Sequence, residues 1–197
     1  MITNWGEKIA RKLAASGTIS PEEIDLYGYG FFLLLSSTLY LIVVAIFGSV
    51  FGVLWESIVF YFLFSILRGY AGGIHAKTEY GCMLSTILAL LLSTMGIRGM
   101  LQAEHSTMAM MLLIVGCAVV FLFSPLDVPE KPLSIDDRLY YQRTSRCLAT
   151  AYALLGMWAM VARWEILYSI AASVTLEGIL IFAGTVNLRK TLSESMK

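Results

Sequence analysis

Six long apolar stretches constrain the fold of this sequence more than any other feature. They cover about residues 31–50, 51–67, 83–99, 107–124, 147–163 and 165–186, separated by polar or Pro- and Gly-bearing breaks. About 20 apolar residues carry a helix across the hydrocarbon core of a bilayer. Charged residues make up only 14% of the chain, whereas soluble domains contain about a quarter. The sequence therefore predicts an all-α integral membrane protein with six transmembrane helices.

The basic residues predict how these helices are oriented, because cytoplasmic loops are enriched in Lys and Arg. Of the 14 Lys and Arg residues, 12 lie in the N-terminal region, in residues 68–82, in residues 125–146 and in the C-terminal tail. The alternate loops contain only Arg98 and Arg163. We therefore expect a multi-pass protein of the cell membrane with both termini and residues 68–82 on the cytoplasmic side.

The chain, residues 1–197, is predicted to form a single membrane domain. Residues 1–20 are expected to hold an amphipathic interfacial helix, although packing of this helix on the protein's own cytoplasmic face is an open alternative. Ser20 and Pro21, followed by Glu23, have the pattern of a helix start, so the first spanning helix is expected to begin near Pro21. The remaining parts are a helical hairpin (21–67), a catalytic segment (68–82), a second hairpin (83–124), a cytoplasmic loop (125–146) and a third hairpin (147–188).

Composition argues against several kinds of partner. The formal net charge is zero, and the basic residues do not gather on one face, so nucleic-acid binding is not expected. Cys82, Cys117 and Cys147 are widely spaced and form no CxxC pair. We therefore expect no disulfide framework, no metal site and no cofactor.

Residues 68–82 carry the groups best suited to catalysis. This segment holds one of two histidines, His75, and one of three cysteines, Cys82. A thiol and an imidazole base are the minimum parts of a cysteine nucleophile. On an unbroken helix the two residues would be separated by roughly 10 Å of rise, so the backbone must bend if they act together. Gly69, Gly72, Gly73 and Gly81 permit the backbone to fold back between them. Cys82 is expected in the first turn of the third span, where the helix N-terminus favours a thiolate.

Each of these residues also has an ordinary structural interpretation. Cys82 can be a small packing residue, and His75 can cap a helix or reach the lipid headgroups. Arg68 can be an anchor on the cytoplasmic side. Gly72 and Gly73 can form a simple loop.

The spacing of Arg68, His75 and Cys82, with glycines just before the histidine, resembles the AgrB family (accessory gene regulator protein B). Members are membrane cysteine endopeptidases that process quorum-sensing peptide precursors in Gram-positive bacteria. The resemblance implies that Cys82 is the nucleophile, that His75 is its base and that Arg68 is needed for activity. It also implies an AgrD-like precursor peptide as substrate and a homodimer in the lipid bilayer.

The implied reaction is cleavage of the precursor's C-terminal part through an acyl-thioester, followed by cyclisation to a thiolactone. Substrate contacts are expected from Arg68, Gly72, Gly73, Lys131, Arg138 and Arg143. The cationic loop that contains the last three of these can instead be a topology signal. Glu79, Asp136 and Asp137 are candidates for a third group that orients His75.

A small six-span transporter is the main alternative function, and a membrane scaffold without catalysis is another. In the transporter, Glu56 and Glu177 would line the transport path, and the glycine-rich segment would be a broken helix. Carboxylates inside a membrane are costly, which makes both residues candidates for a function; Glu165 lies at a span end and can reach water.

Overall fold

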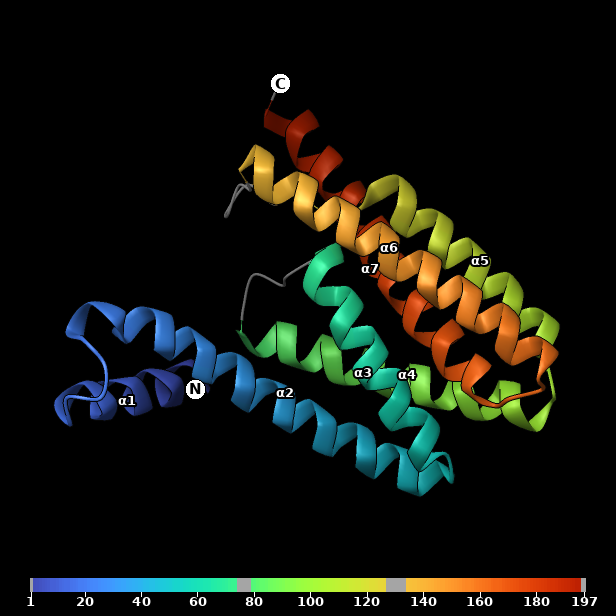
Figure 1. The fold of residues 1–197 in the computed structure, drawn as a ribbon, viewed down its shortest axis with the longest axis horizontal. Helices are drawn as coiled ribbons and strands as arrows, with labels where there is room; N and C mark the ends of the chain where they lie inside the picture. Colours follow the sequence, from blue (N-terminus) through green and yellow to red (C-terminus); the bar gives the residue numbers. More distant parts are fainter. Residues whose placement is uncertain (1, 74–78, 127–133, 196–197) are drawn as a thin grey trace. The chain divides into compact units, whose positions relative to one another are not determined.

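A computed structural model describes residues 2–73, 79–126 and 134–195, and all the regular structure in these residues is helical. The prediction of an all-α fold is confirmed (Figure 1). The elements are α1 (Ile2–Ala15), the short 3-10 helix η1 (Pro21–Glu23), α2 (Ile24–Phe51), α3 (Leu54–Ala71), α4 (Glu79–Gln102), α5 (Ser106–Phe123), α6 (Ile135–Val161) and α7 (Ile166–Ser195).

The chain divides into two compact units, Met1–Val43 and Val44–Lys197. In the first unit α1 approaches the start of α2 closely, because a Cβ at Gly6 would lie 2.5 Å from the backbone oxygen of Gly28. The backbone N–H of Ser20 donates to the Glu23 carboxylate at 2.9 Å and stabilises the turn before α2. The predicted N-terminal helix and the predicted helix start near Pro21 are therefore confirmed.

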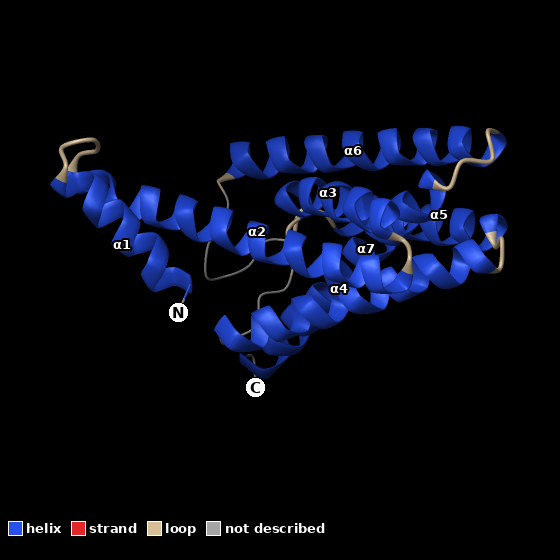
Figure 2. Cartoon of the chain, turned by 90° about the horizontal axis from the view of Figure 1, so that it is seen from below, coloured by secondary structure: helices blue, strands red, loops and turns tan. Residues whose placement is uncertain are grey.

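The second unit is built around α7. This helix packs against α3, α4, α5 and α6, and Figure 2 shows α6 along one side of the unit. In the most apolar window of α7, 67% of the residues are buried, whereas no other candidate span exceeds 28%. We infer that α7 is the central helix of this unit.

Four helices in the described residues are long and apolar enough to cross a membrane. They cover Pro21–Phe51, Tyr80–Gln102, Ser106–Phe123 and Ile166–Leu188, and they coincide with four of the six predicted spans. The chain is therefore a multi-pass membrane protein. Helix α3 carries Glu56 and Arg68 within its 18 residues, and α6 begins with a charged segment. The count of six spans and the orientation of the termini stay predictions.

The turn of the first hairpin is very short. Helix α2 continues to Phe51, and only Gly52 and Val53 lie between the helices. Gly52 has a φ of +71°, which favours glycine. Gly48 serves helix packing instead, because a Cβ there would lie 2.8 Å from the Cα of Leu54.

The predicted loop 125–146 is shorter than expected, since α6 begins at Ile135. Ser134 caps the helix: the backbone N–H of Asp137 donates to its hydroxyl oxygen at 3.1 Å. Asp136 and Asp137 lie in the first turn, where the positive end of the helix dipole stabilises their negative charge. This polar helix start has no apolar periodicity, and hydropathy alone therefore assigned it to a loop.

Candidate active site

Helix α3 ends in a glycine turn, Gly72 and Gly73. Gly72 has a φ of 76° and a ψ of −169°, and its backbone N–H donates to the backbone oxygen of Arg68 at 3.3 Å. A Cβ at Gly72 would lie 3.0 Å from the backbone oxygen of Leu126. Both the backbone conformation and the close approach of Leu126 therefore favour glycine at this position. Helix α3 therefore ends at these glycines, and the predicted fold-back of the chain between His75 and Cys82 involves residues outside the described ones.

The loop after α5 holds this turn from outside. The backbone N–H of Leu126 donates to the backbone oxygen of Ala71 at 3.0 Å. The buried Ser124 hydroxyl lies 3.5 Å from the same oxygen and 2.8 Å from the Ser145 hydroxyl of α6. The end of α3 is thus connected to α5 and α6 at the point where the glycine turn begins.

Arg68 lies in the last turn of α3 and folds back over the glycine turn. Its Nη1 donates to the backbone oxygen of Gly72 at 3.4 Å and lies 3.7 Å from Oε2 of Glu177 in α7. A Cβ at Gly73 would overlap the guanidinium. Arg68 is thus more than a charge at a helix end, because it links the glycine turn to the central helix.

Cys82 is the fourth residue of α4, in its first turn, as predicted. It is a free cysteine with a half-buried side chain. Its backbone oxygen accepts hydrogen bonds from the hydroxyls of Ser85 at 3.0 Å and Thr86 at 2.8 Å. His75 lies outside the described residues, so its pairing with Cys82 stays a prediction.

The other predicted site residues lie apart from this turn in the chain. Arg138 and Arg143 are exposed residues of α6, not of a loop, and Lys131 lies outside the described residues. Among the candidates for a third catalytic group, Asp137 accepts a hydrogen bond from the Ser134 hydroxyl at 2.7 Å and therefore belongs to the α6 cap. Asp136 is exposed in the same turn, and Glu79 begins α4.

A family model described as accessory gene regulator B matches residues 6–181, which include the glycine turn and Cys82. The chain belongs to the AgrB family. A putative AgrB-like protein 2 of Clostridium perfringens (strain 13 / Type A) is 26% identical over 182 residues, covering 89% of this chain and 85% of the relative. A putative AgrB-like protein of Clostridium perfringens (strain SM101 / Type A) is 25% identical over 190 residues, covering 91% and 87%. No solved structure matches the chain.

Membership of the AgrB family implies that the chain processes an autoinducing-peptide precursor, and AgrB proteins are known peptidases. An AgrD-like peptide is the substrate that this membership implies. The recognition made from Arg68, His75 and Cys82 in the sequence is confirmed.

One residue of the glycine-turn region was not assigned to the AgrB site from sequence. Glu177 is fully buried in α7 and lies beside Arg68. The sequence marked it only as a carboxylate inside a membrane span. A second signal was available, because a buried carboxylate needs a cation nearby and Arg68 ends a neighbouring span.

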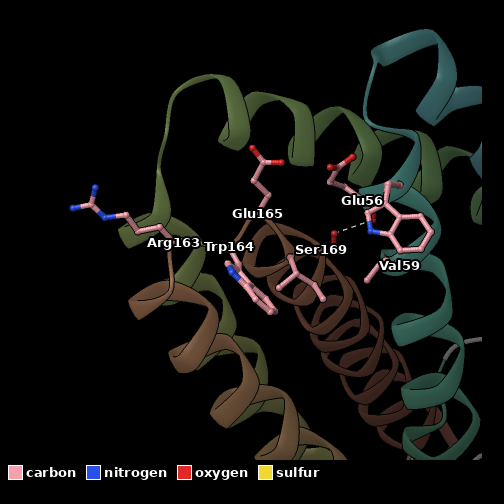
Figure 3. A pocket seen from close by; sticks show the side chains of 8 residues that line it. Glu56, Val59, Arg163, Trp164, Glu165 and Ser169 are labelled. Atoms are coloured by element: carbon pink, nitrogen blue, oxygen red, sulfur yellow. Dashed lines mark hydrogen bonds between the residues drawn. The ribbon is translucent and has the colours of Figure 1, made fainter.

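A cavity of about 460 Å³ lies between the starts of α3 and α7 (Figure 3). Its lining includes Trp55, Glu56, Trp164 and Glu165, and the carboxylates of Glu56 and Glu165 point the same way in Figure 3. Glu56 and Arg68 are twelve positions apart on α3, which corresponds to about 18 Å along the helix axis. The cavity is therefore at the far end of α3 from the glycine turn.

Proposed function

We propose that this AgrB family member is a membrane cysteine endopeptidase that cleaves an autoinducing-peptide precursor and promotes its cyclisation. The observation that carries the proposal is the placement of Cys82. The cysteine is the fourth residue of α4, the helix that follows α3 and its glycine turn in the sequence. At a helix N-terminus the unpaired backbone N–H groups and the helix dipole favour a thiolate and an oxyanion.

In the proposed reaction the Cys82 thiolate attacks a peptide carbonyl carbon in the C-terminal part of the precursor. His75 takes the thiol proton and returns it to the leaving amine when the C–N bond breaks. The N-terminal fragment then remains on Cys82 as a thioester. An internal cysteine of the precursor attacks this thioester, forms the thiolactone and releases the Cys82 thiol.

Arg68, Gly72 and Gly73 are proposed to contact the substrate near the scissile bond. The exposed side chains of Arg138 and Arg143 are suited to attract acidic residues of the peptide. Lys131, which lies between α5 and α6 in the sequence, is proposed to attract the same residues. The proposal places the site on the cytoplasmic side, where Cys82 stays reduced. A homodimer is part of the same proposal.

The test is reconstitution of the purified protein with an AgrD-like peptide that carries an internal cysteine. Wild type, Cys82→Ala, Cys82→Ser and His75→Ala are compared by mass spectrometry of the peptide and of the protein. We expect wild type to yield cleaved, cyclised peptide and a trapped acyl-enzyme. Cys82→Ala should yield neither, and His75→Ala should react slower by a factor of about 100 or more.

Cleavage by Cys82→Ala at the wild-type rate would rule out this thiol as the nucleophile. Transport of the intact peptide into vesicles, unaffected by Cys82→Ala, would support the transporter instead.

A further inference from the structure

Glu177 is the most unusual buried group in the described residues. Its side chain is fully buried in the middle of α7, the most deeply packed candidate span. Neither carboxylate oxygen lies within hydrogen-bond distance of a donor in the part of the chain that the structure describes. An ionised carboxylate in such a place is costly unless a cation balances it.

Arg68 provides that cation. Its Nη1 lies 3.7 Å from Oε2 of Glu177, and the arginine side chain is 23% exposed, whereas the glutamate side chain is 0% exposed. The pair therefore joins a buried carboxylate on α7 to a guanidinium at the edge of the protein interior. A buried pair of this kind adds little net stability, but loss of one partner leaves an uncompensated charge.

On its other side the Arg68 guanidinium contacts the glycine turn. Arg68 donates to the backbone oxygen of Gly72 at 3.4 Å and lies against Gly73 so closely that a Cβ at residue 73 would overlap it. A guanidinium shifted by about 1 Å would lose one of these contacts. The position of Glu177 therefore determines where Arg68 meets the glycine turn.

We propose that Glu177 is a positioning residue for the peptidase reaction: from α7 it holds Arg68 over Gly72 and Gly73. The inference rests on the proposed function. His75 follows Gly73 by two residues in the sequence, so displacement of the turn is passed on to the proposed base over a short length of chain. Glu177 itself touches no reacting atom in this proposal.

The experiment compares Glu177→Gln, Arg68→Gln and the double variant Arg68→Gln/Glu177→Gln with wild type, all as full chains in the same lipid. Glu177→Gln keeps the shape of the side chain and removes its charge. Two matched controls are Ser173→Ala, a buried polar change one turn earlier in α7, and Glu165→Gln, the same chemical change at an exposed glutamate. The measurements are the rate of acyl-enzyme formation with an AgrD-like peptide and the midpoint of thermal unfolding.

We expect Glu177→Gln to slow acyl-enzyme formation by about 10- to 100-fold, because loss of orientation near a reacting group has effects of this size. The unfolding midpoint should stay within about 3 °C of wild type, because the charge left behind, on Arg68, is 23% exposed and reaches solvent. Both controls should react at the wild-type rate. The double variant should be no slower than Arg68→Gln, since Glu177 acts through Arg68. It should also unfold at a higher temperature than Arg68→Gln, because the second change removes the unpaired buried charge.

Three results would overturn the proposal. The first is acyl-enzyme formation by Glu177→Gln at the wild-type rate. The second is a double variant whose rate falls by the product of the two single effects. The third is a double variant that unfolds at the same temperature as Arg68→Gln or at a lower one. If Glu177→Gln fails to fold, Glu177→Asp is used, because it keeps the charge and moves it back by one methylene group. Acyl-enzyme formation by Glu177→Asp at the wild-type rate would also contradict the proposal. The unfolding measurements need no peptide, so they test the Arg68–Glu177 ion pair even if the wild-type protein is inactive. An inactive wild-type protein would contradict the proposed function instead.

Discussion

The three cysteines have different surroundings, and this difference bears on which of them reacts. Cys82 is half-buried in the first turn of α4, Cys117 is buried in α5, and Cys147 is exposed on α6. The thiol of Cys117 donates to the backbone oxygen of Ala149 at 3.4 Å, which ties it to α6. Cys82 alone lies in the helix that comes next after the glycine turn in the chain.

The double variant Cys117→Ala/Cys147→Ala should retain peptide cleavage within about twofold of wild type, because surface and packing changes away from a site have small effects. Loss of the buried Cys117 thiol should cost about 1 kcal/mol of stability. Cleavage by mass spectrometry and thermal unfolding measure the two effects. An inactive variant that folds normally would mean that Cys82 is not sufficient as the only thiol.

At the scale of the helices, α5 and α7 come together through glycine. A Cβ at Gly116 of α5 would lie 2.8 Å from the backbone oxygen of Val174, and one at Gly178 of α7 would lie 3.3 Å from the Cα of Gly116. Small residues at such crossings let two backbones approach closely inside a membrane. This contact holds α7, and with it Glu177, in the middle of the second unit.

Gly116→Ala should therefore lower the stability by about 1–3 kcal/mol, as overpacking of a close contact does. The matched control is Gly96→Ala in α4, where nothing lies within 4 Å of the added Cβ. Relief of the glycine penalty should make that control neutral or more stable by up to about 1 kcal/mol. Thermal unfolding in one detergent gives both values. Equal midpoints for the two variants would show that the crossing tolerates a methyl group.

At the scale of the whole molecule, the number of spans decides the side on which the reaction occurs. If all six predicted stretches cross, Ser134 lies on the same side as the termini and Glu104 on the other. If α3 and α6 do not cross, the two positions exchange sides. The termini are on one side in both cases and cannot distinguish these arrangements. The basic residues favour six spans, because four would move Arg68, Arg138 and Arg143 outside.

We expect a cysteine placed at Ser134 to be protected from an impermeant thiol reagent in whole cells and a cysteine placed at Glu104 to be labelled. Both side chains are exposed in the described structure. The background is a chain in which all three native cysteines are alanine, and labelling after membrane permeabilisation is the control. The reverse pattern of labelling would contradict the six-span prediction.

Much of the fold follows from local features of the sequence. Apolar length predicted α2, α4, α5 and α7, and the Ser20–Glu23 pattern predicted the start of the first long helix. The start of α6 at Ile135 was missed because a polar capped turn resembles a loop when only hydropathy is considered. Cys82 was placed correctly because a helix start depends on a few neighbouring residues.

What the sequence determined by itself is a membrane protein of the AgrB family with a cysteine at the start of a helix after a glycine-rich break. Only the tertiary structure brought Glu177 to Arg68, Leu126 to Ala71, and Gly116 to α7. The physical reason is that apolar length, capping and backbone freedom act between neighbours in the chain. The meeting of a carboxylate on one helix with a guanidinium on another depends on how the helices pack and in which register.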